Sequence, residues 1–306
     1  MLTTRQISSG YTWVNVIEPT SSELKSLVDD YGATIEILGY AVDRNERARV
    51  ETDLDKNIFL IIFDALTNNF DNNGQTEPIS FLTIGNVIIT FTHNSTSYMQ
   101  EIFENNINHI KENDLITHQI FDAILETLYT LTNMYLDAIT QINFQRQSIQ
   151  NQFKNRLNRT GIDSMLQLET SIIYLLTSAK ANTSLLLSMN RMQNLQMDTE
   201  QHERLEDVIV ESQQAQEMAE LCSDIIDRVS SSYSNVLDNN LNHTMKFLTV
   251  FSIVLAVPNI VFGFYGQNVP LPFGKASWGW EFTILLSFGL IGIVYLIANW
   301  SDFFKK

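Results

Sequence analysis

Two long apolar runs without a charged residue lie close together in the last part of the sequence, Phe247 to Tyr265 and Phe282 to Trp300. A helix of that length spans roughly 28 Å, close to the hydrocarbon thickness of a bilayer. Trp278, Trp280 and Trp300 stand at the ends of the second run, where membrane interfaces favour aromatic side chains. Buried core helices can also be apolar, but two neighbouring runs this uniform favour a protein with two membrane-spanning helices.

Lysines flank these runs unequally. Lys246 precedes the first run and Lys305 and Lys306 follow the second, whereas the loop 266–281 carries Lys275 alone. Because positive residues favour the cytoplasmic side, we expect a multi-pass plasma-membrane protein with both termini in the cytoplasm and the loop outside. The first thirty residues contain no apolar stretch, so no secretory segment is predicted there.

The net charge of −16 is unevenly distributed along the chain. Residues 247–306 sum to +1, which leaves −17 for residues 1–246. This acidic part disfavours nucleic acid and anionic lipid as partners and favours cations, although a merely solubilising acidic surface would have the same composition. The single cysteine, Cys222, excludes an intrachain disulfide and is typical of a reducing compartment.

Proline is absent between residues 79 and 257, so long helices are permitted there. Apolar residues at helical spacing predict one helix from about residue 115 to a stop near Thr160-Gly161. Asp163 is the expected cap of a second helix that ends near Met192. A third helix is expected to run without a break from about residue 200 to residue 265.

The residues before 95 have a different pattern. Residues 11–17 alternate as a strand, residues 20–23 match a capping box for a short helix, and residues 58–63 form a continuous apolar strand. Residues 79–84 and 87–91, joined by Gly85-Asn86, predict a hairpin. The expected fold is thus an α+β membrane protein. It consists of a cytoplasmic α/β domain 1–95, a cytoplasmic helical segment 96–198, a stalk helix 199–246, a first transmembrane helix 247–265, an outer loop 266–281, a second transmembrane helix 282–300 and a cytoplasmic tail 301–306.

The last long helix carries a stripe of polar and small residues at alternating steps of four and three. In and just before the first apolar run, this polar stripe consists of Asn242, Met245, Thr249, Ser252, Ala256, Asn259 and Gly263. A coiled coil would place apolar residues at such spacing, so the stripe favours a wetted surface, such as a pore lining between several copies. Alternatively, small residues allow close helix packing in lipid, with Asn259 as an interhelical hydrogen-bonding group.

Motifs around the two spans resemble the CorA family of divalent-cation channels. They are residues 242–249, Pro258 and Tyr265-Gly266-Gln267-Asn268, followed by a Trp-containing loop, a second span and terminal lysines. Residues 13–16, 19–20 and 43–51 resemble the cytoplasmic domain of that family. The resemblance implies a funnel-shaped homopentamer whose stalk helix lines a pore in the lipid bilayer, with Mg²⁺ as the usual transported ion and Co²⁺ or Ni²⁺ as further ones.

Two departures from the family pattern concern the substrate. Gln267 replaces the methionine of the usual Gly-Met-Asn, as in relatives that include zinc transporters, and the outer loop has no carboxylate from Gly266 to Trp280. The resemblance implies a selectivity mouth at Gly266, Gln267 and Asn268, whose carbonyl oxygens would accept hydrogen bonds from the waters of hydrated Mg²⁺. Cys222 and five scattered histidines have no zinc-type spacing, which favours hydrated Mg²⁺ over tightly coordinated Zn²⁺.

Met245 and Leu248 are the expected hydrophobic gate, because apolar constrictions can close a pore by dewetting. The resemblance also implies that intracellular Mg²⁺ is a regulatory ion, bridging carboxylates of neighbouring cytoplasmic domains. Asp207 matches the position of one such carboxylate, with Asp64 or Asp71 as its expected partner. An ordinary solvated helix face is the alternative for Asp207.

Functions of other classes stay open at this point. A membrane-tethered enzyme would need a catalytic motif in residues 1–246, and the sequence has no recognisable phosphate loop, His/Cys/Asp cluster or nucleophile elbow there. An anchored structural or signalling protein would need neither the polar stripe nor the Gly-Gln-Asn turn. The sequence favours a self-assembling, non-enzymatic divalent-cation channel without an organic cofactor, and a zinc transporter of the same family is the alternative.

Overall fold

The computed structural model describes residues 1–8, 11–53, 55–68, 70, 75–108, 116–153, 159–192, 195, 197–267, 269, 271–272 and 277–300. The chain divides into two compact units, Met1–Ser230 and Ser231–Lys306. Helix α7, Thr199–Tyr265, contributes residues to both units.

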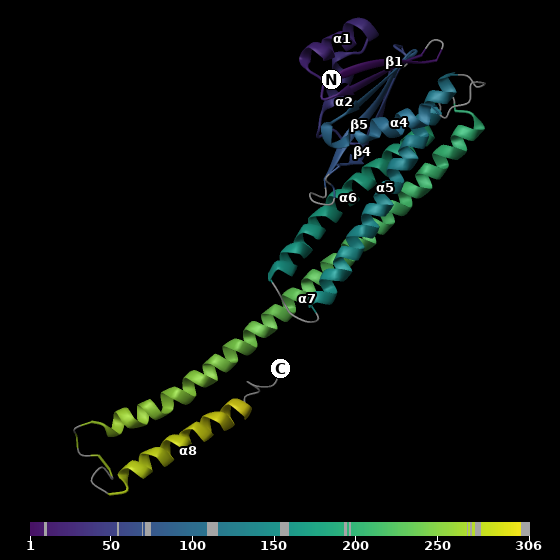
Figure 1. Cartoon of the computed structure of the whole chain (residues 1–306). Helices are drawn as coiled ribbons and strands as arrows, with labels where there is room; N and C mark the ends of the chain where they lie inside the picture. The colour runs from purple at the N-terminus through teal and green to yellow at the C-terminus, as the bar shows by residue number, and fades with distance from the viewer. Residues whose placement is uncertain are drawn as a thin grey trace. The chain divides into compact units, whose positions relative to one another are not determined.

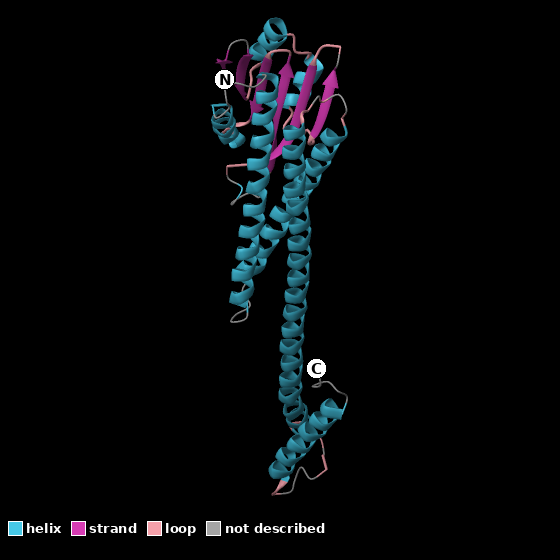
Figure 2. Ribbon diagram, turned by 90° about the vertical axis from the view of Figure 1, so that its right-hand side faces the viewer, coloured by secondary structure: helices cyan, strands magenta, loops and turns pink. Residues whose placement is uncertain are grey.

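The first unit contains a six-stranded sheet in the order β1-β2-β6-β5-β4-β3 (Figures 1 and 2). β2 and β6 pair in parallel, and the other neighbours are antiparallel. The strands are β1 Leu2–Ser8, β2 Tyr11–Ile17, β3 Arg49–Asp53, β4 Ile58–Leu66, β5 Thr76–Ile84 and β6 Val87–Thr92. The expected strands are confirmed. β1 and β3 are not predicted by the apolar pattern, because they are edge strands rich in polar residues.

Helices cover both faces of this sheet, and the alternation of side chains along β4 shows how. Leu60 and Ile62 lie in a core cluster with residues of α1, Ser21–Tyr31, and α2, Ile35–Val42. Phe59, on the opposite side of the strand, contacts Phe121 of α5, Ile116–Phe153. β4 is therefore apolar at nearly every position because both of its faces are buried.

The opposite face also packs against two other helices, α4, Tyr98–Asn108, and α6, Arg159–Arg191. Phe103 of α4 lies between Trp13 of β2 and Phe81 of β5, with ring centroids 5.4 Å apart in each pair. Such offset and edge-to-face contacts are favourable arrangements of aromatic rings. The helical segment and the sheet thus share one hydrophobic core.

Local signals define the turns around the sheet. Thr20 caps α1 as predicted: its hydroxyl accepts from the Glu23 N–H, and its own N–H donates to the Glu23 carboxylate at 2.8 Å. This interaction lowers the pKa of Glu23. Gly32 ends the helix with a φ of 74°, a conformation that favours glycine. Gly85, with a φ of 54°, opens the predicted hairpin turn between β5 and β6.

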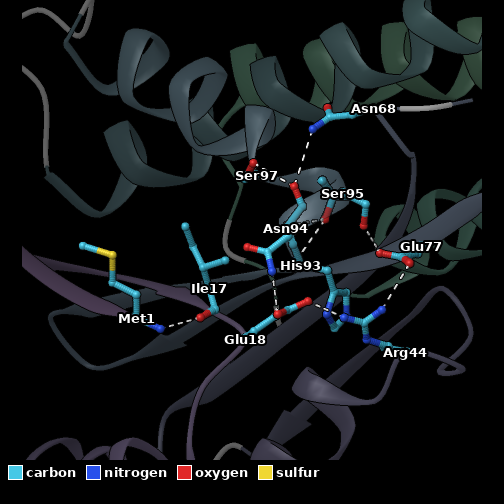
Figure 3. Close-up of polar contacts among 11 residues, drawn as sticks. Met1, Ile17, Glu18, Arg44, Asn68, Glu77, His93, Asn94, Ser95 and Ser97 are labelled. Carbon is cyan, nitrogen blue, oxygen red and sulfur yellow. Dashed lines mark hydrogen bonds and ion pairs between the residues drawn. The ribbon is translucent and has the colours of Figure 1, made fainter.

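An ion-pair cluster joins the segment after α2 to β5 and to the residues that follow β2 and β6 (Figure 3). Arg44 pairs with the carboxylates of Glu18 and Glu77, and the Asn94 amide donates to Glu18 at 2.6 Å. His93 is buried beside them, and its burial, together with the Arg44 charge, lowers its pKa. Arg44 belongs to one of the motifs that carry the family resemblance, and here it crosslinks three parts of the domain.

The boundary between α5 and α6 differs from the prediction. The helix expected to stop at Thr160-Gly161 ends at Phe153, and α6 begins at Arg159. Gly161 and Asp163 therefore lie in the first turns of α6, and Asp163 is not its cap. A glycine costs about 1 kcal/mol in a helix interior, so it is a weak stop signal where following residues such as Met165 and Leu168 are buried on one helix face.

The second unit consists of the end of α7 and α8, Gly279–Trp300. The unbroken helix predicted for residues 200–265 is confirmed by α7, which contains Pro258 without ending there. Only 6% of the apolar window in each of these two helices is buried within the chain, and both are long enough to cross a membrane. The second span begins at Gly279, three residues before the predicted start.

Candidate cation pathway

Between residues 247 and 265, one side of α7 is partly shielded from solvent by the rest of the chain. The α8-facing stripe, as we name it, is the set of residues there that are not fully exposed: Val250, Val254, Val257, Pro258, Val261 and Tyr265. On α8 the less exposed residues recur at the same helical spacing, with Ser287 buried. The rings of Tyr265 and Phe282 are in contact, with centroids 6.1 Å apart. The two helices therefore meet along these stripes.

The polar stripe lies on the other side of α7. Its seven members, Asn242, Met245, Thr249, Ser252, Ala256, Asn259 and Gly263, are all exposed. At 3.6 residues per turn, the centres of the polar stripe and the α8-facing stripe are about 180° apart around the helix. Packing of α8 thus leaves the whole polar stripe uncovered within the unit.

The predicted gate residues also lie on exposed surface of α7. Met245 is 65% exposed and Leu248 is 57% exposed. They are three residues apart, so their side chains are neighbours on one turn of the helix. A single chain forms no constriction with them, and any closure of a pathway by Met245 and Leu248 would require further copies of α7.

The predicted mouth follows directly after the last turn of α7. The Gly266 N–H donates to the Phe262 carbonyl at 2.8 Å, and the Gln267 N–H donates to the Phe264 carbonyl at 3.4 Å. A Cβ atom on Gly266 would approach the Phe262 carbonyl to 3.0 Å, which explains the glycine. Gly266 and Gln267 are exposed, and Asn268 lies outside the described residues. The negative end of the α7 dipole at this point attracts cations.

Asp207, the predicted regulatory residue, is exposed on α7 in the first unit. Of its two expected partners, Asp71 lies outside the described residues. Asp64 is half-buried on β4, where Ser178 of α6 partly offsets the effect of burial on the pKa of its carboxyl group. The two aspartates that are described are therefore in different surroundings, and the structure does not bring Asp64 out as a free surface ligand.

The backbone of Asp64 is held from two helices. The Asn182 side chain accepts from the Asp64 N–H and donates to the Asp64 carbonyl, both at 2.9 Å. The Tyr135 hydroxyl donates to the same carbonyl at 2.7 Å. Burial raises the pKa of Asp64 to about 6. These contacts make Asp64 part of a polar clamp between β4, α5 and α6.

Sequence reasoning missed the α8-facing stripe and the ring contact that Phe282 makes. The stripe is visible in the sequence as valines at positions 250, 254, 257 and 261, a 4-3-4 spacing that marks one helix face. In a segment that is apolar all round, however, this spacing alone does not distinguish a protein-facing side from a lipid-facing one.

Comparison with known proteins agrees with this architecture. Residues 8–300 match the family described as CorA-like Mg²⁺ transporter protein. A relative from Methanocaldococcus jannaschii, the cobalt/magnesium transport protein CorA, is 22% identical over 289 residues, which cover 94% of this chain and 90% of the relative.

Solved structures show the same fold. The complete CorA magnesium transporter from M. jannaschii has a TM-score of 0.76 at 21% identity, covering 95% of this chain and 90% of its own. The full-length CmaX protein has a TM-score of 0.71 at 13% identity, covering 93% and 88%. The ZntB cytoplasmic domain from Vibrio parahaemolyticus has a TM-score of 0.57 at 11% identity, covering 75% and 88%.

The family match spans nearly the whole chain, and the α/β domain, the long α7 helix and the two apolar helices correspond to those of the family. This chain belongs to the CorA family of divalent-cation transporters.

Proposed function

We propose that five copies of the chain surround an axis and form a channel for hydrated divalent cations, with Mg²⁺ as the main substrate. One observation carries this proposal: α8 covers the side of α7 opposite the polar stripe. If α8 is the outer helix of each copy, the polar stripes of neighbouring copies face one another around the axis. Asn242, Thr249, Ser252, Ala256, Asn259 and Gly263 then line the pathway, and Met245 and Leu248 form its gate.

The exposed polar groups of the stripe support this arrangement. An asparagine in the middle of a membrane span is costly unless it is wetted or paired, and Asn259 is exposed within one chain. A Cβ atom on Gly263 would meet nothing within 4 Å. Packing within a single chain therefore does not require a glycine at position 263. A pathway wide enough for a hydrated ion would require a small residue there.

The chemistry of the mouth suits a hydrated ion. Mg²⁺ releases its waters reluctantly, so rings of oxygens from Gly266, Gln267 and Asn268 would bind those waters rather than the metal itself. The negative end of α7 adds a favourable field for cations at the same place. A zinc substrate is the second candidate, and Gln267 in place of the usual methionine is the observation that favours it.

The acidic first unit provides the proposed regulation. With −17 on residues 1–246 of each copy, neighbouring copies repel one another, and bound Mg²⁺ would offset that repulsion. Asp207 is exposed and available for such a contact between copies, whereas Asp64 is engaged inside its own domain. The flanking lysines support a channel in the plasma membrane with this unit and both termini in the cytoplasm.

Thiol accessibility tests the orientation of the polar stripe. In a Cys222→Ala background, cysteines replace Ser252 and Ala256 in the polar stripe, and Val254 in the α8-facing stripe as the matched control. In proteoliposomes, a charged water-soluble thiol reagent should modify the first two and block Mg²⁺ flux, and it should spare Val254→Cys. Modification of Val254→Cys with protection of Ser252→Cys and Ala256→Cys would contradict the proposed pore lining.

Substrate identity needs a separate measurement on the same vesicles. Mg²⁺ uptake is measured with Co²⁺, Ni²⁺ and Zn²⁺ as competitors, with and without a proton gradient. Preferred Mg²⁺ uptake supports the main proposal. Preferred Zn²⁺ uptake that depends on the proton gradient would replace it with the second candidate, and no uptake of any of these cations would contradict both.

A further inference from the structure

Four aromatic rings form a continuous series at the end of the second unit where α7 meets α8. Phe264 contacts Tyr265 at 5.5 Å between ring centroids, Tyr265 contacts Phe282 at 6.1 Å, and Phe282 contacts Trp278 at 6.0 Å. The planes of each pair are inclined by 69° to 79°, so all three contacts are edge-to-face. This is the favourable geometry for aromatic pairs within the observed distance range.

The series connects the two helices next to the predicted mouth. Tyr265 is the last residue of α7 and directly precedes Gly266, and Phe282 lies in the first turn of α8. The Phe282 N–H donates to the Trp278 carbonyl at 3.1 Å, which ties the first turn of α8 to the residue before it. Tyr265 and Phe282 are half-buried against each other, whereas Trp278 and Phe264 are largely exposed.

Little else in the described residues holds the mouth in place. Gly266 has no side chain, and the N–H groups of Gly266 and Gln267 donate to carbonyls of the preceding turn. The positions of Gly266 and Gln267 therefore follow the position of Tyr265. Tyr265 is in turn supported from α8 through its contact with the Phe282 ring.

We propose that Phe282, acting through Tyr265, is a positioning residue that sets the positions of Gly266 and Gln267 in the mouth and thereby the selectivity among divalent cations. A ring of water-binding oxygens discriminates ions by the spacing of those oxygens, so a small movement of Tyr265 changes discrimination more than total flux. This inference rests on the proposed function in one respect, the role of the mouth in selecting the ion.

The test compares Phe282→Ala with Phe282→Tyr and with Phe288→Ala, an exposed phenylalanine on the same helix. The readout is the ratio of Mg²⁺ to Co²⁺ flux in proteoliposomes. Phe282→Ala removes the edge-to-face pairs with Tyr265 and Trp278, and loss of the Tyr265 pair corresponds to a change of about two- to tenfold in this ratio. Phe282→Tyr should restore the ratio, and Phe288→Ala should leave it unchanged. A purely structural role for Phe282 would lower both fluxes and the yield of assembled protein together, at a constant ratio.

A local probe separates this inference from the proposed function. Val269 is exposed just after the mouth, and Val269→Cys in the Cys222→Ala background reports the environment of the turn by its rate of thiol modification. Phe282→Ala should change that rate and Phe288→Ala should not. An unchanged rate together with an unchanged flux ratio in Phe282→Ala would overturn the positioning role.

The mouth itself is tested by Asn268→Ala, which should reduce flux to near background. If Asn268→Ala has no effect on flux or on the ratio, the proposed mouth is wrong, whatever the Val269→Cys rate shows about Phe282. If Asn268→Ala abolishes flux while Phe282→Ala changes neither measurement, the proposed function stands and the positioning role fails. Should Phe282→Ala not assemble, Phe282→Leu keeps the volume without the ring and is measured in the same way.

Discussion

The two units treat their large apolar residues in opposite ways. In residues 1–230 the largest of these residues lie in cores between sheet and helices, as Phe81, with 0% of its surface exposed, and Phe103 illustrate. In residues 231–306 most of them are on the surface, as with Phe247, which is 71% exposed. Large exposed apolar surface on a protein marks an interaction site or a membrane contact. The first unit buries its large apolar residues within the chain, whereas the second leaves most of them exposed.

Polar residues follow the same division. In the first unit, buried polar groups such as Asn182 and Tyr135 bond to the backbone of β4. In the second unit, the polar stripe has Asn242 and Asn259 exposed along α7. The buried polar groups of the first unit therefore stabilise its fold, whereas Asn242 and Asn259 are not buried by their own chain.

The largest expected effect tests the division directly. Phe81→Ala should lower the free energy of unfolding by about 3–5 kcal/mol, because it opens a cavity in a close-packed core. Phe247→Ala should change it by less than about 0.5 kcal/mol, because that side chain contacts solvent or lipid. Both are measured by denaturant unfolding of the full chain in detergent. Equal losses would mean that the second unit also packs its apolar residues within one chain.

A smaller effect concerns the charge that the first unit buries. The pKa of Asp64 is raised to about 6 by burial, above the ordinary 3.8, so its charged form disfavours the folded state. The free energy of unfolding therefore falls as the pH rises from the ordinary pKa of aspartate to the raised pKa of Asp64. The fall is about 1–3 kcal/mol, a range that allows for the partial exposure of the side chain. Asp64→Asn should remove this fall and stabilise the protein at pH 7.5.

The control for this measurement is Asp29→Asn on the exposed side of α1, which should leave the dependence of unfolding on pH unchanged. Thermal unfolding at a series of pH values between 4 and 8 provides the comparison. If Asp64→Asn retains the wild-type dependence, Asp64 is solvated and the polar clamp does not bury its charge.

The smallest expected effect concerns two apolar residues of the first unit that are exposed, unlike most of its large apolar residues. Val210 and Leu221 of α7 belong to the first unit but are exposed, and they lie on the same side of the helix. Val210→Ser and Leu221→Ser should change the unfolding free energy by less than about 0.5 kcal/mol. They should nevertheless shift the assembled protein toward smaller species in light scattering after size-exclusion chromatography. Unchanged assembly in both variants would exclude these residues from contacts between copies.

Elements whose signal is local were predictable from the sequence. The capping box at Thr20, the hairpin at Gly85 and the unbroken helix α7 depend on neighbouring residues, and all three are confirmed. The edge strands β1 and β3 were not predicted, since their composition is largely polar, and the short helix α2 was missed although Thr34 caps it locally. The stop expected at Gly161 was wrong because packing overrode a weak helix propensity.

For the candidate site, too, the sequence revealed local features and missed contacts between distant residues. The family resemblance pointed to Gly266 and Gln267, and a repeated spacing pointed to the polar stripe, but the role of these residues stays a prediction. The sequence named Asp64 as a possible surface ligand, and the structure places it in a clamp with Asn182 and Tyr135. Those partners are 118 and 71 residues away in sequence, so no local pattern could reveal them.

What this sequence determined by itself is the pair of membrane-length helices, the long α7 helix and the family, because length, hydropathy and short motifs are properties of contiguous residues. The tertiary structure alone decided which side of α7 meets α8, that Phe282 supports Tyr265, and that Asp64 is turned inward. The physical reason is that an apolar helix can bury any of its faces at similar free energy. The choice is made by the particular side chains, distant in sequence, that fit against it.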